Sequence, residues 1–216
     1  MRQSQIDEVW MLLDREALAQ ITYEGPKPVF ATISGAHLYG FASADSDVDL
    51  RGAYLLPPGD LLGLKKPAET LTIEDNGEIE LDWVAHDLRK FARMMINHNG
   101  YVLEQLFSPL VVIETAAFEE LRALGKGCVT RRTLRHYQGF FRGRRKRLEE
   151  PNATVKHLLY AYRVLLTGIH LMRTGEVVSN VTLLNEEFRI PEIEEFVERK
   201  RLGTEKMPLL PEEGEA

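Results

Sequence analysis

The chain has few of the residues that hold small secreted or zinc-binding proteins together. It contains one cysteine, Cys128, among 216 residues, so no intrachain disulfide can form, and its six histidines do not group with that cysteine at zinc-ligand spacing. No apolar run approaches the ~20 residues that a bilayer-spanning helix needs. The first residues, MRQSQIDEVW, include acids and lack the apolar core of a signal peptide. These absences exclude a disulfide framework and a zinc finger, and we expect a cytoplasmic protein that does not cross a membrane.

The chain also lacks a strong net positive charge. Its formal net charge is −6, with 44% hydrophobic and 28% charged residues, which is ordinary for a globular protein and argues against a generic nucleic-acid coat. Between Arg131 and Arg147, however, there are eight Lys or Arg residues and no acid. These cations either form a solvated or acid-paired helix face or contact the phosphates of a nucleotide or an acceptor.

The most informative stretch runs from Thr32 to Pro57. An apolar run at 29–33 predicts a buried strand, and a second one is predicted at about 48–55, beginning within the segment Ser46-Asp47-Val48-Asp49-Leu50-Arg51. Successive side chains of a strand point to opposite faces, so Asp47 and Asp49 share a face. Two carboxylates held together repel each other at neutral pH unless a cation, an arginine or a proton shares the site. If a metal does so, hard oxygen ligands favour Mg²⁺ or Mn²⁺. Two aspartates in this spacing are also common on solvated surfaces, and the surrounding order of elements favours the metal.

A glycine turn, Ser34-Gly35-Ala36, separates the two predicted strands. Gly35 lets the backbone pass close to a ligand, and a short helix that begins near Ala36 or His37 would aim free N–H groups at a phosphate. The turn and the pair of aspartates that follows it together favour a site that binds a phosphate group beside a metal.

A hairpin is predicted further along the chain. Segments 70–74 and 78–84 flank Asp75-Asn76-Gly77, whose Asn-Gly pair accepts the positive φ angles of a tight turn. On its second arm Glu80 and Asp82 alternate with apolar residues and therefore share one face.

These motifs resemble the signature of the DNA polymerase β-like nucleotidyltransferase superfamily. The chain looks most similar to a bacterial and phage group of predicted nucleotidyltransferases that includes a polymerase β-like protein associated with RNA repair. The resemblance covers most of residues 29–176. It rests on Ser34-Gly35-Ala36-His37-Leu38-Tyr39-Gly40, Ser46-Asp47-Val48-Asp49-Leu50-Arg51-Gly52, Asp82-Trp83-Val84, Asp87-Leu88-Arg89-Lys90-Phe91, Leu103-Glu104-Gln105-Leu106-Phe107-Ser108-Pro109 and the helix from Lys156 to Glu176.

The resemblance implies an α+β fold, in which a small mixed or antiparallel sheet with flanking helices is followed by a helical domain. It implies that Asp47, Asp49 and a third carboxylate, Asp82 first and Glu80 second, are catalytic and bind the metal. It also implies nucleotide binding by Ser34, Gly35, Ala36 and His37, with Lys156, Tyr160 and Arg163 supplying cations and an aromatic ring. One position departs from the family, because Ala36 replaces the usual phosphate-binding serine.

The expected organisation is a catalytic domain at 1–110, a helical substrate- or nucleotide-binding domain at 111–201 and a flexible acidic tail at 202–216. Residues 5–20 are predicted to form one amphipathic helix. In the helix at 154–174 the predicted core face is Leu158, Tyr162, Leu165, Ile169 and Met172.

The expected activity is metal-dependent transfer of NMP from an NTP to an acceptor hydroxyl, with release of pyrophosphate. An RNA end is the expected acceptor, and a protein hydroxyl or a small molecule is left open. The alternative is a nucleotide- or RNA-binding regulatory protein, similar to antitoxin-like members of the superfamily, that has the same fold and little turnover. Ala36 motivates this alternative.

Overall fold

The computed structural model describes residues 1–64, 66–76, 80–203 and 207–209, and these divide into two compact units. The first unit comprises Met1–Gly35 and Asp47–Val129, and the second comprises Ala36–Ser46 and Thr130–Ala216. The chain therefore crosses between units within the motif, after Gly35 and after Ser46. Residues 111–129, expected in the helical domain, fall in the first unit because they supply a sheet strand and a helix that packs on it.

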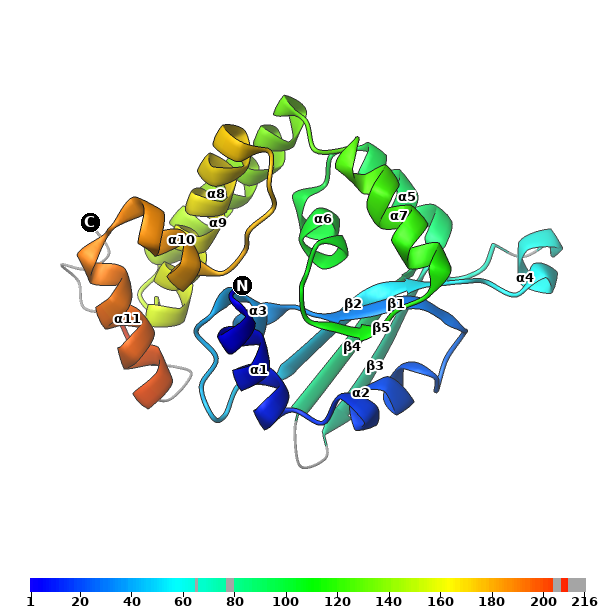
Figure 1. Ribbon diagram of the computed structural model, residues 1–216, viewed down its shortest axis with the longest axis horizontal. Coiled ribbons are helices and arrows are strands. Elements are labelled where there is room, and N and C mark those ends of the chain that lie inside the picture. Colours follow the sequence, from blue (N-terminus) through cyan, green and yellow to red (C-terminus); the bar gives the residue numbers. More distant parts are fainter. Residues whose placement is uncertain (65, 77–79, 204–206, 210–216) are drawn as a thin grey trace. The chain divides into compact units, whose positions relative to one another are not determined.

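A five-stranded mixed sheet, in the order β3-β4-β2-β1-β5, organises the first unit (Figure 1). β2 and β4 pair in parallel, whereas the other neighbouring strands are antiparallel. The strands are β1 (Pro28–Ile33), β2 (Val48–Tyr54), β3 (Thr70–Asn76), β4 (Glu80–Asp87) and β5 (Val111–Ile113). A mixed sheet with flanking helices confirms the predicted α+β class, and β3 and β4 pair as the predicted hairpin. Residue 77 of the expected turn lies outside the described residues.

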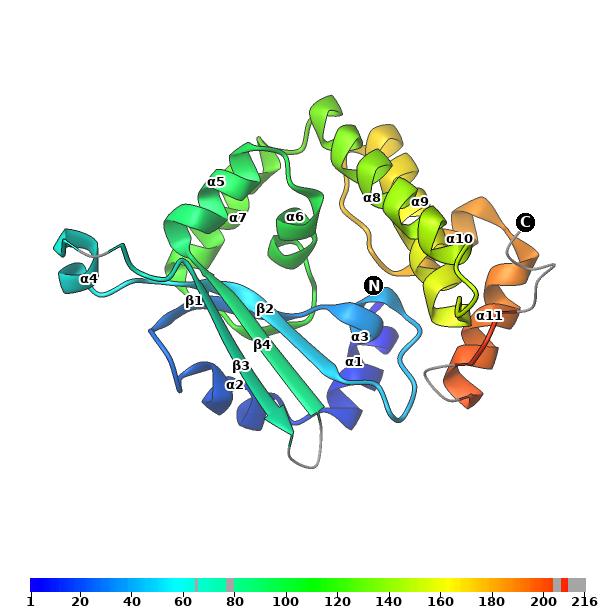
Figure 2. The ribbon, with the colours of Figure 1, turned by 180° about the vertical axis from the view of Figure 1, so that it is seen from behind.

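Helices cover this sheet because much of it is apolar. Every residue of β1 is buried, and the ring of Phe30 packs against Phe91 and Phe118. The helices of the first unit are α1 (Gln3–Leu12), α2 (Arg15–Thr22), α4 (Pro58–Leu62), α5 (Leu88–Ile96), α6 (Gly100–Leu106) and α7 (Ala116–Lys126). Phe91 and Phe118 belong to α5 and α7, so these helices pack on the face of the sheet to which Phe30 points (Figure 2).

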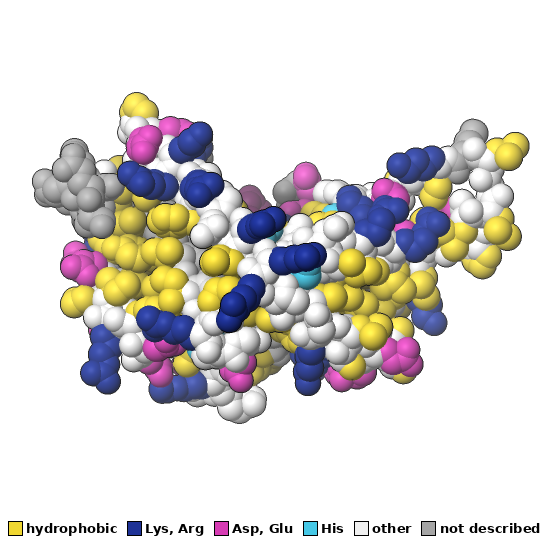
Figure 3. Space-filling model, turned by 90° about the horizontal axis from the view of Figure 1, so that it is seen from above, with side chains coloured by type: hydrophobic (Ala, Val, Ile, Leu, Met, Phe, Trp, Pro, Cys, Tyr) yellow, Lys and Arg dark blue, Asp and Glu magenta, His cyan; other side chains and the backbone are white. Residues whose placement is uncertain are grey.

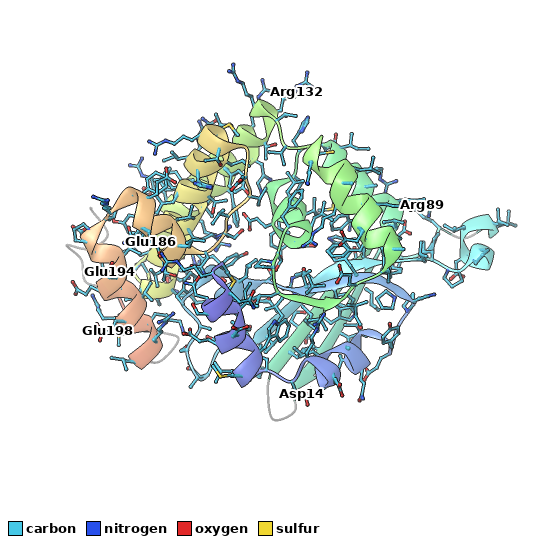
Figure 4. All side chains as sticks on the ribbon, in the orientation of Figure 1. Asp14, Arg89, Arg132, Glu186, Glu194 and Glu198 are labelled. Carbon is cyan, nitrogen blue, oxygen red and sulfur yellow. The ribbon has the colours of Figure 1, made fainter. Side chains whose placement is uncertain are left out.

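The prediction of a single helix at 5–20 is wrong, because two helices occupy that stretch. Leu13 is extended, and the carboxylate of Asp14 accepts hydrogen bonds from the backbone N–H groups of Glu16 and Ala17 at the start of α2 (Figure 4). An aspartate that caps a new helix ends the helix before it.

A short arm carries α4 away from the sheet (Figure 1). Leu62 and Leu64 of this arm are 86% and 107% exposed, and hydrophobic side chains are visible at its tip in the space-filling view (Figure 3). The arm contributes little to the core of the first unit.

The second unit is helical and centred on α9. Its elements are α3 (Gly35–Tyr39, counted from the last residue of the first unit), η1 (Arg131–Thr133), α8 (Leu134–Leu148), α9 (Val155–Thr174), α10 (Val181–Phe188) and α11 (Pro191–Leu202). α8, α10 and α11 all pack against α9. The predicted core face of α9 is therefore only partly right: Leu165 is 36% exposed, whereas Arg163 and Thr167 are fully buried.

Part of the expected tail pairs with the start of α9. The backbone N–H of Val155 donates to the carbonyl of Met207, and that of Leu209 donates to the carbonyl of Ala153. Residues 204–206 and 210–216 lie outside the described residues. Among the described helices, none combines the length and apolar character that crossing a membrane requires.

Candidate active site

Two of the predicted carboxylates lie side by side on neighbouring parallel strands. Asp49 of β2 is the register partner of Asp82 of β4. In-register side chains on adjacent strands point to the same face of a sheet. Both residues are half-buried, whereas the alternating neighbours Leu50 and Trp83 are fully buried on the opposite face. The sheet therefore presents an acidic pair on one face and core residues on the other.

Arg51 joins this acidic pair. Its Nη2 donates to Asp49 Oδ1 at 2.5 Å and to Asp82 Oδ2 at 2.9 Å, while its Nη1 donates to the carbonyl oxygens of Leu50 and Asp82, each at 2.7 Å. Its Nε donates to the hydroxyl of Tyr101 in α6 at 2.8 Å. Burial alone lowers the pKa of Arg51, but Tyr101, Asp49 and Asp82 outweigh burial and raise that pKa. Arg51 is a fixed cation that holds both carboxylates in place.

The glycine turn lies directly against Asp49. Gly35 has φ +60°, and a Cβ at this position would stand 1.8 Å from Asp49 Oδ2. The backbone N–H of Ser34 also donates to the carbonyl of Asp49 at 2.8 Å. Only glycine fits here, because any side chain would collide with the carboxylate and would have to adopt a left-handed conformation.

The remaining residues of the motif are less exposed than the sequence suggested. Ser34, Ala36 and His37 are 2%, 5% and 7% exposed, and α3 has only five residues. Asp47 is half-buried and lies one residue before β2. Glu80 is exposed at the first position of β4, before the register pairs with β2 begin.

Three predicted nucleotide-binding residues belong to α9 in the second unit. Lys156 and Tyr160 are half-buried, whereas Arg163 is fully buried, with its guanidinium carbon 4.0 Å from the ring centroid of Tyr39. Tyr39 and Tyr160 pack edge to face with ring centroids 5.5 Å apart. The structure thus brings Tyr160 and Arg163 together around a tyrosine that follows the glycine turn.

Sequence reasoning missed two residues of this site. Tyr101 has no sequence signal, because it meets Arg51 only through the packing of α6 on the sheet. Glu74 of β3 is the register partner of Asp82, which places it on the same face as the acidic pair. Knowledge of which residues pair in the hairpin would have indicated Glu74. That pairing depends on the length of the turn, which the sequence alone did not define.

The donor set suits a hard divalent cation. Asp82 Oδ1 is buried without a hydrogen-bond partner, and the missing Cβ of Gly35 leaves room for Asp49 Oδ2. Carboxylate oxygens are the ligands that Mg²⁺ and Mn²⁺ prefer. Within the described ranges, no group of three or more His, Cys, Asp or Glu side chains is already gathered as a metal cluster. Asp49 and Asp82, which share the guanidinium of Arg51, supply oxygen donors of this kind.

His86 lies on the same face of β4, four residues beyond Asp82, and its charge affects the stability of the sheet. Burial, followed by the positive charges of Lys90 and Arg51, lowers the pKa of His86 to about 4. Since the unfolded chain protonates near 6.5, folding stability is complete above that pH and declines as the pH falls toward 4. The decline is roughly 1–2 kcal/mol, because His86 is only half-buried and solvent screens its charge.

We expect His86→Asn to remove this contribution while keeping an acceptor for Thr70, whose Oγ1 lies 3.2 Å from His86 Nδ1. Urea unfolding at pH 7 and at pH 4.5 gives the loss of unfolding free energy between the two pH values, and this loss should be larger in wild type than in the variant. Equal losses of stability in the two proteins would show that His86 does not titrate with folding.

Comparison with known proteins places the chain in a family. The sequence profile of the RNA repair pathway DNA polymerase beta family matches residues 13–210. An uncharacterized protein of Methanocaldococcus jannaschii is 30% identical over 157 residues, 71% of this chain and 63% of the relative. The uncharacterized protein YcgL of Bacillus subtilis is 30% identical over 190 residues, 84% of this chain and 72% of the relative. The chain thus spans under two thirds of the archaeal relative's length.

Among solved structures, a nucleotidyltransferase-like protein from Exiguobacterium sibiricum aligns with 88% of this chain and 66% of its own, at a TM-score of 0.41 and 12% identity. The sequence relationship is the stronger finding, since the family profile extends over nearly the whole chain and includes both aspartates of the motif, the glycine turn and Asp82. This chain therefore belongs to the RNA repair pathway DNA polymerase beta family, a group of polymerase β-like nucleotidyltransferases.

Proposed function

We propose that the protein is a metal-dependent nucleotidyltransferase that moves NMP from an NTP to a hydroxyl at an RNA end. The observation that carries the proposal is the in-register pair Asp49 and Asp82, clamped by Arg51 and packed against Gly35. Family membership supports nucleotidyl transfer, and the family's description supports RNA as the acceptor.

The metal ligands in this proposal are Asp49 and Asp82, joined by Asp47. A bound Mg²⁺ or Mn²⁺ would supply charge neutralisation of the triphosphate and a lower pKa for the acceptor hydroxyl. Arg51 would keep the two in-register carboxylates at a fixed separation, so that little reorganisation is needed when the substrate arrives. Gly35 would let the backbone of the turn approach the phosphates.

The transfer itself forms one bond and breaks one. The acceptor oxygen attacks the α-phosphorus, the bond between the α-phosphorus and the bridging oxygen of the β-phosphate breaks, and pyrophosphate leaves with the electron pair. Asp82 is the proposed acceptor of the hydroxyl proton, with Glu80 as the second choice. Lys156 and Tyr160 are the proposed contacts to the nucleotide. Arg163, proposed with them, is fully buried and would act indirectly, by holding the ring of Tyr39.

The test is incubation of the purified chain with each α-labelled NTP, Mg²⁺ or Mn²⁺ and a pool of small RNAs, followed by separation of RNA, protein and free nucleotide. We expect label on RNA, with pyrophosphate released in equal amount. The Asp47→Ala/Asp49→Ala protein is the control and should transfer none.

Other outcomes of this assay separate the competing functions. Label on protein or on a small molecule would replace the RNA acceptor while leaving nucleotidyl transfer in place. Thermal stabilisation by an NTP without any transfer would favour the regulatory protein, for which Ala36 in place of a serine is the structural argument.

A further inference from the structure

The outer face of α8 carries a row of exposed cations with no acid among them. Arg135, Arg142 and Lys146 repeat at intervals of seven and four residues, which places them on one side of the helix. All three are exposed, and Arg145 is exposed beside them. Arg131 and Arg132 of η1 precede this row, and Arg132 points away from the ribbon (Figure 4). We call these six residues the basic face.

The cations of the basic face form no ion pairs with the other described residues, whereas arginines on several other helices do. Arginines on α5, α7, α9 and α11 form ion pairs, namely Arg93 with Glu69, Arg122 with Glu119, Arg173 with Glu187 and Arg199 with Glu195. In the described part of the chain, none of the six residues of the basic face forms an ion pair. Acids of the second unit include Glu149 and Glu150 at the C-terminal end of α8, where Glu150 pairs with Arg147. Others lie on α10 and α11, including Glu186, Glu194 and Glu198 (Figure 4).

The same face carries two glycines that weaken the helix. Gly139 and Gly143 lie four residues apart among the cations, both are exposed, and a Cβ at either would meet nothing within 4 Å. Each glycine costs an exposed helix about 1 kcal/mol relative to alanine, and like charges four residues apart, such as Arg142 and Lys146, destabilise it further. The two glycines therefore lower the stability of α8 and leave its backbone uncovered between positively charged side chains.

The inner side of α8 adds to the positive potential. Arg144 lies over the rings of Phe140 and Tyr160, 4.8 and 4.9 Å from their centroids, so aromatic faces rather than acids accompany its charge. Burial lowers the pKa of His157, and the charges of Arg147 and Arg144 lower it further. The region around α8 thus opposes the addition of another positive charge and favours an anion.

The arrangement of these residues fits a phosphate backbone. Arg135 and Lys146 are about 16 Å apart along the helix axis, a length over which one strand of a duplex-like nucleic acid presents roughly five phosphates. The aromatic side chains of α8 are buried or half-buried, so the exposed face has no platform on which bases would stack. This side of the helix also lacks the apolar side chains with which an amphipathic helix inserts into a membrane surface.

We propose that the basic face is the surface on which the protein binds the phosphate backbone of its RNA, with the helix backbone approached closely at Gly139 and Gly143. This proposal rests on the RNA acceptor of the proposed function and names where that RNA docks. Binding through phosphates is independent of base sequence and falls steeply with salt.

The test measures RNA binding without catalysis, by fluorescence anisotropy of a labelled mixed-sequence RNA of ~20 nucleotides with the full chain, without NTP and with EDTA, at salt concentrations of about 50 to 200 mM. The variant Arg135→Gln/Arg142→Gln/Lys146→Gln should lower the slope of log K against log salt by about 2. Over this fourfold range, wild type should therefore lose about 16-fold more affinity than the variant. The matched control Lys27→Gln/Lys126→Gln/Arg189→Gln removes three exposed positive charges elsewhere and should retain the wild-type slope.

A second variant tests the close approach. Gly139→Ala/Gly143→Ala should raise the melting temperature, because alanine favours the helix, and yet weaken RNA binding severalfold, because the methyl groups hold the backbone of the RNA away. Unchanged RNA affinity in this variant would overturn the docking geometry. Equal slopes of log K against log salt for the triple variant and its control would overturn the proposal that the basic face binds RNA. Absence of RNA binding by wild type would overturn it as well. Because neither measurement needs transfer, failure of the enzyme assay alone would leave this result standing.

Discussion

Asp49→Asn is expected to lower the rate of nucleotidyl transfer by about 10³-fold or more while leaving the fold intact. The amide has the shape of the carboxylate and keeps an oxygen that accepts from Arg51 Nη2, so the contact with Arg51 survives. What the variant loses is the negative charge that would hold a divalent cation beside the triphosphate. Initial rates with a labelled NTP at saturating Mg²⁺ measure the loss, and urea unfolding measures the fold.

Two further variants decide which residue is the third carboxylate. Asp82→Asn should resemble Asp49→Asn, because Asp82 is the register partner of Asp49 and shares its arginine. Glu80→Gln should change the rate less than about threefold, since an exposed residue that precedes the pairs between β4 and β2 contributes weakly. The reverse order of effects would assign the role to Glu80. Full activity in Asp49→Asn would contradict the metal-dependent mechanism.

The acidic face could be predicted from the sequence because a strand has a simple period. Alternation alone indicated that Asp49 points to the face opposite Val48 and Leu50, and in the structure those two residues are buried while Asp49 is half-buried. Pairing between distant strands follows from the whole sheet, and the family resemblance rather than periodicity indicated Asp82. The contact of Arg51 with Tyr101 depends on how α6 packs, and no local pattern encodes it.

The helical unit was harder to predict because α9 is enclosed on several sides. Leu165 follows the apolar stripe and yet is 36% exposed, whereas Arg163 breaks it and is fully buried. A stripe model assumes one buried face, but α8, α10 and α11 all pack against α9. The guanidinium of Arg163 lies over an aromatic ring, and cation–π attraction offsets part of the cost of burying a charge.

Arg51→Met is expected to destabilise the protein by about 2–3 kcal/mol in the absence of divalent cations. The methionine fills the space of the arginine stem but leaves Asp49 and Asp82 facing each other without a cation, and it leaves the Tyr101 hydroxyl without its donor. Removing one partner of a buried charge cluster costs about 3–5 kcal/mol, and the loss here is smaller because the side chain of Asp82 is 35% exposed. Urea unfolding in EDTA measures the loss, with Arg51→Lys as an intermediate case.

Magnesium should then restore part of the stability of the Arg51→Met protein. In wild type the guanidinium already neutralises the acidic pair, so an incoming cation gains less there than in the variant. At about ten times its Kd, Mg²⁺ stabilises a protein by about 1.4 kcal/mol, and this gain should appear in Arg51→Met at a lower Mg²⁺ concentration than in wild type. If Arg51→Met is destabilised but Mg²⁺ restores nothing, Asp49 and Asp82 are held together for structural reasons and do not form a metal site. A gain that disappears in the Arg51→Met/Asp49→Asn double variant would assign the magnesium response to this pair of carboxylates.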